Sequence, residues 1–105
     1  MGTMRHHAII VTSWDKGAID EAHAKAADLM EHVSGIVPGV VNGQASFAVL
    51  PDGSKEWWDT SDKADEARAQ FIEWMGSRKY LDYAAVSFGE LSATFETNCN
   101  PIPTP

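Results

Sequence analysis

Two adjacent histidines are the first residues in this sequence whose type and spacing are suited to chemistry. His6 and His7 precede an apolar run, and neighbouring side chains on a strand point to opposite faces, so the pair cannot easily hold one metal ion. Two-histidine phosphoesterases use a His-x-Thr or His-x-Ser pair twice, whereas Ala8 and Ile9 stand at that spacing here. The sequence also contains no glycine-rich phosphate loop, nucleophile elbow or paired-cysteine zinc signature. We therefore expect no catalytic residues, no metal and no cofactor, and keep His7 as a candidate binding residue.

Tryptophans in expected loops form the second group of candidates. Trp14 follows the first apolar run, and Trp57, Trp58 and Asp59 lie in a polar connection in the middle of the chain. Loop tryptophans often anchor protein partners or stack on ligands, although burial as a lid over the core is the competing interpretation. The acids around this connection lack the alternating oxygen ligands of an EF-hand loop and are better explained as complements of a helix dipole. We predict a binding role for these four residues together with His7.

Charge and composition restrict the partners and the compartment. The chain has 8 Lys and Arg against 15 Asp and Glu, a formal net charge of −7. Phosphate contacts normally use Lys or Arg, so we expect no direct nucleic-acid binding, whereas an acidic surface suits basic protein surfaces or simply solubility. No apolar stretch approaches the roughly 20 residues that span a bilayer, and no signal-peptide pattern is visible. These features predict a cytoplasmic protein without a membrane partner.

Length and cysteine usage predict a single domain without disulfides. The 105 residues suit one core, and Cys99 has no second cysteine in its chain with which to pair. One α+β domain is expected over residues 1–95. An irregular or disordered tail rich in Asn and Pro is expected over residues 96–105.

Hydrophobic periodicity predicts the elements of the first half. A β-branched run with apolar residues on both faces predicts a central strand over residues 6–13. Apolar residues at helical spacing predict a helix over residues 16–34, with Asp15 as its N-cap. His23 lies on or beside the apolar stripe of this helix, where we expect a packed, hydrogen-bonded imidazole.

A hairpin is expected next, with Asn42-Gly43 at its tip. Both residues tolerate the positive φ that a type I′ turn requires, and apolar runs flank them. A two-residue tip pairs Val40 with Ala45 and places Val40 on the same face as Phe47. Pro38 cannot donate to a ladder, so the first arm should lie at the edge of the sheet.

The second half of the sequence is predicted to form a helix and one last strand. Ser61 or Asp62 is the expected N-cap of a helix that ends near Met75. Between residues 84 and 95 the apolar phase changes at Gly89, where a β-bulge would keep all apolar side chains on one face of a single strand. The order of elements is β-α-β-β-α-β, which predicts a ferredoxin-like α+β fold with a four-stranded antiparallel sheet and two helices on one face.

This architecture predicts a core and an uncovered sheet face. The side chains expected to be mostly buried are Ile10, Val11, Met30, Phe47, Val49, Phe71, Trp74 and Phe88. Ile9, Val11, Val86 and Phe88 cannot all point toward the helices with Ile10, so some of them should lie on the face without helices. A large apolar patch seldom stays in water on a monomer, so we expect a homodimer through sheet packing or edge pairing. Coverage by the tryptophan loop or by the tail is the alternative.

Several short segments of the sequence resemble segments of a known protein family. They are residues 6–15 (HHAIIVTSWD), 41–43 (VNG) and 51–56 (PDGSKE), with residues 61–62 and 71–74 in agreement. These strings resemble a family of small, uncharacterised proteins encoded by tailed bacteriophages and prophages, over the first three-quarters of the chain up to about Leu81. The resemblance brings no catalytic residues with it. It implies a host-cytoplasm setting and an accessory role.

The resulting functional hypothesis is a small, acidic, non-enzymatic phage accessory protein that binds and inhibits a host factor or defence system. The alternative is a small-molecule-binding domain or enzyme of dimeric α+β-barrel type, with His7, Trp14 or His23 lining the pocket. A structural component of the virion is the third possibility.

Overall fold

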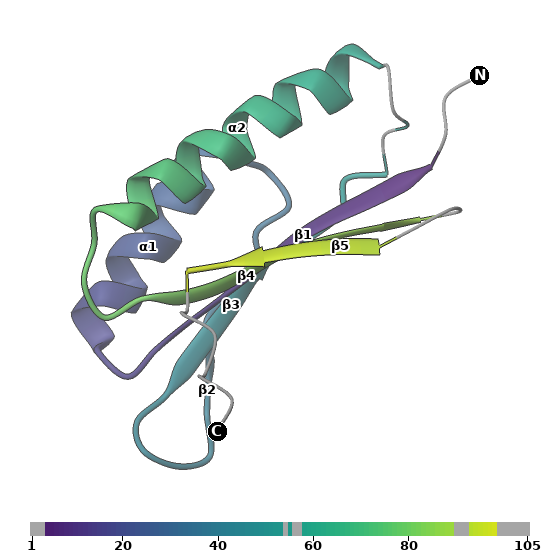
Figure 1. The fold of residues 1–105 in the computed structure, drawn as a ribbon. Helices are drawn as coiled ribbons and strands as arrows, with labels where there is room; N and C mark the ends of the chain where they lie inside the picture. The colour runs from purple at the N-terminus through teal and green to yellow at the C-terminus, as the bar shows by residue number, and fades with distance from the viewer. Residues whose placement is uncertain (1–3, 54, 56–57, 90–92, 99–105) are drawn as a thin grey trace, which may run out of the picture.

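One antiparallel sheet with two helices on a single face makes up the described part of the chain (Figure 1). The structure is a computed structural model of the 105 residues and describes residues 4–53, 55, 58–89 and 93–98. Its elements are β1 (Arg5–Ser13), α1 (Lys16–Leu29), β2 (Val37–Pro38), β3 (Ala45–Val49), α2 (Asp59–Gly76), β4 (Asp82–Gly89) and β5 (Ala93–Thr97). The strand order is β2-β3-β1-β4-β5, and every neighbouring pair is antiparallel.

The sheet has five strands, so the prediction of four is wrong. The residues expected to form one last strand with a bulge form a hairpin, in which β4 and β5 pair with Val86 opposite Phe95. Val86, Phe88, Ala93 and Phe95 do share a face, because the chain folds back rather than forming a bulge, and Leu91 lies outside the described residues. Gly89 lies against the backbone of Met4, where a Cβ would collide with the carbonyl oxygen. Because β5 pairs with the side of β4 that faces away from β1, β4 is an interior strand and β5 is the edge strand.

The end of the regular structure also differs from the expected boundary. Glu96 and Thr97 belong to β5, so the irregular tail expected from residue 96 does not begin there. Asn98 then continues the ordered contacts, because its amide nitrogen donates to the backbone oxygen of Leu81 at 2.6 Å. Cys99 and the residues after it lie outside the described residues.

The central strand β1 turns Ile9 and Val11 toward the helices, and both are buried. The expected burial of Ile10 is wrong, because this side chain is 49% exposed on the opposite face. β1 is apolar on both faces, so its own sequence does not determine which face meets the helices. Pairing with β3 determines which face of β1 meets the helices, because it sets Ile9 opposite Val49 and Val11 opposite Phe47.

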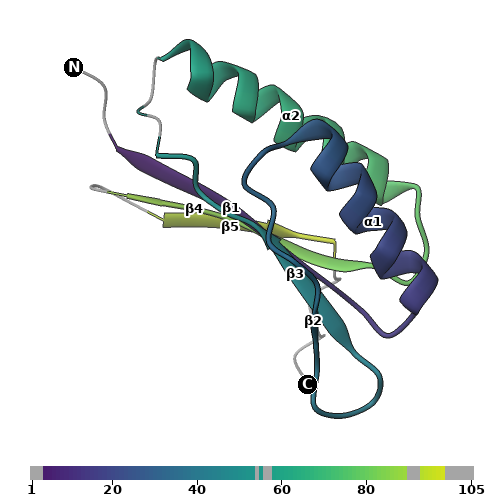
Figure 2. The same ribbon diagram turned by 180° about the vertical axis from the view of Figure 1, so that it is seen from behind.

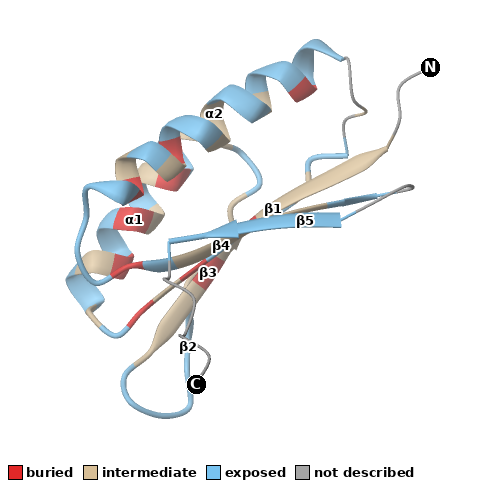
Figure 3. Cartoon of the chain, in the orientation of Figure 1, coloured by how far each residue is buried: buried red, intermediate tan, exposed pale blue. Residues whose placement is uncertain are grey.

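The hydrophobic core lies between the helices and the middle of the sheet (Figure 3). Its buried apolar members are Ile9, Val11, Ile19, Ala22, Ala26, Phe47, Val49, Phe71, Met75 and Leu81. Of the eight residues predicted to be buried, Val11, Phe47, Val49 and Phe71 are confirmed, Met30 and Trp74 are partly buried, and Ile10 and Phe88 are exposed. Phe88 is exposed because it pairs with His6 on the face without helices, where the ring centroids are 5.2 Å apart.

Helix α1 begins as predicted and ends earlier. The side chain of Asp15 accepts a hydrogen bond from the backbone N–H of Ala18 at 2.8 Å, which confirms the N-cap. The helix stops at Leu29, whereas the periodicity suggested residue 34. Ser34 instead lies beside β3, where its N–H donates to the Ala48 oxygen and its hydroxyl accepts from the Ala48 N–H, both at 2.8 Å.

His23 is a packed imidazole, as expected. Its Nε2 lies 2.9 Å from the backbone oxygen of Ser34, and its ring meets Phe47 edge-on at 5.2 Å between centroids. The side chain therefore connects α1 to the segment that follows it and to β3.

The hairpin between β2 and β3 has the predicted tip and a different register. Asn42 and Gly43 have φ values of 59° and 65°, as a type I′ turn requires. Pro38, not Val40, pairs with Ala45, and Val40 is fully exposed. Gly39 approaches the opposite strand so closely that a Cβ would lie 2.9 Å from a backbone oxygen, so the ladder ends before Val40.

Helix α2 begins before the predicted caps. Its N-cap is Trp58, which makes no side-chain capping bond, and Ser61 is buried inside the first turn. Asp59 and Asp62 place two carboxylates in that turn, where they complement the helix dipole. Over the described residues, neither helix has both the length and the apolar character that crossing a bilayer requires.

We expect Phe71→Ala to lower the free energy of unfolding by about 3–5 kcal/mol, because it opens a cavity in the centre of the core. Phe71 is fully buried and lies 6.4 Å from Phe47 and 6.1 Å from Trp74 between ring centroids. Val40→Ala is the control and should change stability by less than about 0.5 kcal/mol. Urea denaturation followed by circular dichroism measures both, and equal small losses would contradict this core.

Candidate functional site

Two hollows lie beside the N-terminal half of α2, and Arg68 lines both. The larger cleft, of about 450 Å³, lies between α2 and the segments that follow α1 and β3. The smaller cleft, of about 390 Å³, lies between α2 and the strands β1, β4 and β5. The volume of the larger cleft falls within the range typical of small-molecule sites.

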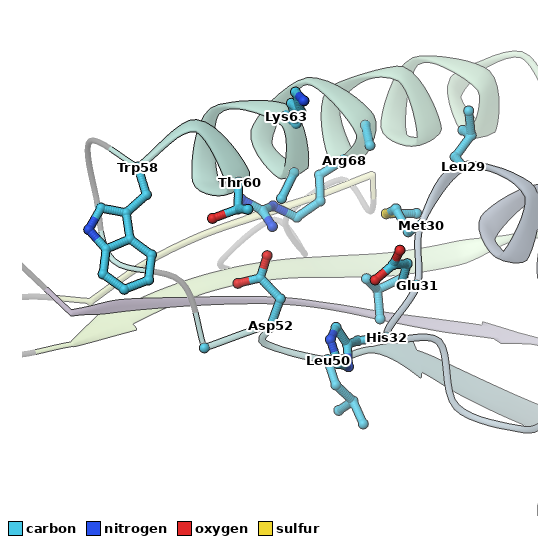
Figure 4. Close-up of a pocket in the computed structure, with 14 residues that line it drawn as sticks. Leu29, Met30, Glu31, His32, Leu50, Asp52, Trp58, Thr60, Lys63 and Arg68 are labelled. Atoms are coloured by element: carbon cyan, nitrogen blue, oxygen red, sulfur yellow. The ribbon is translucent and has the colours of Figure 1, made fainter. Parts of the chain in front are cut away.

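The larger cleft has a tryptophan at one end and facing polar side chains (Figure 4). Trp58 is 49% exposed, so about half of its surface is available to a partner. Thr60 and Arg68 reach from α2 toward Asp52, which rises from the segment after β3. Leu29 lies at the opposite end of the cleft and supplies apolar surface.

A polar cluster lines the smaller cleft and connects three elements. The hydroxyl of Ser87 on β4 accepts a hydrogen bond from Arg5 Nε at 2.8 Å and lies 3.1 Å from His7 Nδ1, both on β1. The other ring nitrogen of His7, Nε2, lies 3.9 Å from an Asp65 carboxylate oxygen. The same carboxylate accepts from the guanidinium of Arg68. The cluster thus extends from the sheet to α2.

The cluster combines the residue types of a serine hydrolase without the required geometry. An activated serine needs a base within hydrogen-bond reach and a third group that orients the base. The 3.9 Å between His7 and Asp65 exceeds the 2.7–3.2 Å of a hydrogen bond. Ser87 also accepts from a guanidinium, which draws electron density away from the hydroxyl oxygen. We therefore interpret the cluster as a structural link between β1 and β4, with His7 also approaching Asp65 on α2.

The residues predicted to bind do not form one site. Trp58 and Asp59 lie together at the start of α2, and His7 lines the smaller cleft. Trp14 is 56% exposed and packs on Tyr80 at the opposite end of β1, at 5.1 Å between ring centroids. The nine residues of β1 span about 30 Å, so one small ligand cannot contact both ends. Trp57 lies outside the described residues.

Sequence reasoning missed four polar residues of the two clefts: Asp52, Asp65, Arg68 and Ser87. A signal existed for Arg68, which precedes Phe71 by three residues and therefore shares its side of the helix. Asp65 precedes Arg68 by the same spacing and forms an ion pair with it. Ser87 and Asp52 gave no comparable signal, because their roles depend on how separate elements pack.

The sheet face opposite the helices, here called the open face, has no described helix over it (Figure 2) and carries the exposed apolar side chains of Ile10, Val37, Phe88 and Phe95. The strand register places on it Val37, Ser46, Ala48, His6, Ala8, Ile10, Thr12, Asp82, Ala84, Val86, Phe88, Ala93, Phe95 and Thr97. Phe95 and Val37 are 74% and 63% exposed. Among these described strand residues, Asp82 alone is an Asp, Glu, Lys or Arg.

Within the described residues, no group of three or more His, Cys, Asp or Glu is placed to hold a metal ion. The side chains of the larger cleft suit a different kind of ligand. An exposed indole offers a stacking surface, and a guanidinium offers a fork of donors to an anionic group.

We expect Ser87→Ala to lower the free energy of unfolding by about 1–3 kcal/mol, because it removes a hydrogen bond to a charged group in a partly buried site. The hydroxyl connects Arg5 and His7, so its removal loosens the contact between β1 and β4. Thr94→Ala, at the exposed position opposite Ser87 on β5, is the matched control. Urea denaturation compares the two, and an equal loss in both variants would count against the cluster as a structural link.

Alkaline pH should weaken the fold through Tyr83. Burial raises the pKa of this phenol above its ordinary value of 10.0, and the nearby charge of Glu96 raises it further. The unfolded chain then ionises first, so stability is complete below the ordinary pKa and is lost as pH rises through the raised pKa. The chain has two tyrosines, so the Tyr80→Phe variant isolates Tyr83 in an absorbance titration. Glu96→Gln should lower the midpoint, and an unchanged midpoint would remove Glu96 as a cause.

Comparison with protein-family models, curated proteins and solved structures gave no match for this chain. The resemblance to small proteins of tailed phages therefore stays a prediction from the sequence. Function has to be argued from the residues and surfaces described above.

Proposed function

We propose that the protein is a small, acidic, non-enzymatic phage protein that binds and inhibits a host factor or defence system in the host cytoplasm. The observation that carries this proposal is the half-exposed side chain of Trp58, which lines a cleft with Asp52 and is followed by Asp59 and Asp62 in the first turn of α2. An exposed indole is a typical anchor in protein interfaces, and carboxylates around it favour a basic partner surface. The resemblance to phage proteins supports the setting.

The position of Trp58 on the helix suits an anchor. It is the N-cap of α2, so its backbone is fixed by the start of a helix of 18 residues. Asp59 and Asp62 follow in the first turn. Burial of the ring would supply affinity, while the charges would accelerate the encounter and select the partner.

The polar cluster supports a non-enzymatic role, since its hydrogen bonds connect β1 with β4 and do not activate Ser87. The net charge of −7 supports protein rather than nucleic acid as the target. The order β2-β3-β1-β4 supports a ferredoxin-like plan to which β5 adds a fifth strand. A homodimer is the proposed unit.

A small-molecule-binding role is the second candidate, and the larger cleft favours it. Its volume of about 450 Å³, the indole of Trp58 and the guanidinium of Arg68 suit a flat, anionic metabolite. A ligand that binds the folded state raises the melting temperature by mass action. Dose-dependent stabilisation by a metabolite, abolished in Trp58→Ala, would favour this candidate over a protein target.

The protein-binding role is tested in bacteria that carry a defence system. Expression of the wild-type protein should raise the plating efficiency of a sensitive tailed phage, and Trp58→Ala should abolish the increase because the anchor is lost. Trp14→Ala is the matched control. Trp14 is similarly exposed, but it does not line the larger cleft, so this variant should keep the increase.

Two results would contradict the proposal. One is an equal loss of activity in both tryptophan variants when circular dichroism shows both to be folded. The other is turnover of a nucleotide or small-molecule substrate by the purified protein at a rate well above buffer.

A further inference from the structure

We propose that the open face is the interface of a homodimer in which two sheets pack face to face. The inference does not depend on the proposed function. It starts from the exposure of Ile10, Phe88 and Phe95 on a face that no helix covers among the described residues (Figure 2). Exposed apolar patches of this kind mark interaction sites in soluble proteins.

The distribution of charge selects a second copy as the occupant. The chain carries 23 Asp, Glu, Lys and Arg residues, the sum of 15 and 8, and Asp82 is the one that the strand register places on the open face. Depletion of charge in the centre of a patch is the compositional signature of a protein interface. A basic partner would find almost no acid there to pair with. An uncharged apolar face is complementary to another of the same kind, and a second copy supplies one.

The shape of the open face suits this packing. The five strands contain 9, 2, 5, 8 and 5 residues, so at about 3.3 Å per residue and about 4.8 Å between strands the open face covers about 460 Å² in plan. This is smaller than the roughly 800 Å² per partner of a standard interface, so the dimer interface is a small one. Two such sheets pack about 10 Å apart with interdigitating side chains. The small side chains of Ala8, Ala48 and Ala84 lie on the same face as the large rings of Phe88 and Phe95. Their difference in size gives the face hollows and projections that can interdigitate with a second sheet.

The arrangement also leaves the clefts accessible. The larger cleft lies on the helix side of the sheet, so a dimer through the open face keeps both copies of Trp58 on its outer surfaces. Each dimer would present two such surfaces in opposite directions.

Light scattering coupled to size exclusion tests the inference. At micromolar concentration the wild-type protein should have twice the chain mass of 11.5 kDa. Phe95→Glu and Val37→Glu each place a charge on the open face at an exposed site, and each should return the protein to the mass of one chain. Val40→Glu, at a fully exposed position in the hairpin loop, is the control and should remain dimeric.

Thr94→Glu separates face packing from edge pairing. Thr94 and Phe95 are neighbours on the edge strand β5, but Thr94 points to the helix side because it pairs with Ser87. Face packing predicts a monomer for Phe95→Glu and a dimer for Thr94→Glu, whereas edge pairing predicts the same mass for both. A wild-type protein with the mass of one chain, or equal masses for these two variants, would overturn the inference. Circular dichroism identifies any variant that fails to fold, and Val37→Glu then carries the test.

Discussion

The register between β1 and β3 is the constraint on which the rest of the structure depends. By setting Ile9 opposite Val49 and Val11 opposite Phe47, it turns one face of an otherwise ambiguous strand toward the helices. A shift of β1 by one residue against β3 would place Ile10 opposite Phe47 or Val49 and turn Ile9 and Val11 away from the helices. The contact between Phe71 on α2 and Phe47 on β3, the polar cluster at the N-terminal end of β1 and the composition of the open face all follow from this register.

Local signals in the sequence predicted the elements well. The Asp15 cap, the Asn42-Gly43 turn and the inner face of α2 depend on interactions within a few residues, so the sequence displays them directly. Distant pairing gave mixed results: the central place of β1 and the edge position of β2 are confirmed, but the phase of β1 and two strand registers were not predicted correctly. The phase of β1 is decided by β3, and the hairpin register by the close approach of Gly39 to the strand opposite. A change of apolar phase at Gly89 is compatible with a bulge or a hairpin, and only the strand that lies beside it decides.

For the candidate site too, local features could be predicted from the sequence and contacts between distant elements could not. The exposure of Trp58 and Asp59 was predictable from their position in a polar connection, whereas their binding role stays a prediction. Asp65 and Ser87 contact His7 from positions that are 58 and 80 residues away in the chain. Hydrophobic periodicity within one element cannot reveal a contact between residues of different elements. A binding role for His7 therefore stays a prediction, while its contacts with Ser87 and Asp65 had to come from the fold.

The two edges of the sheet are unequal, and this limits how far the molecule can polymerise. On one side β2 is only two residues long and ends in Pro38, which has no N–H to offer to an added strand. On the other side β5 exposes five consecutive residues. Growth of a filament by strand addition requires that both edges accept a neighbour, so here a chain of molecules ends after its first junction. The unequal edges thus limit the strand addition through which cross-β aggregates grow.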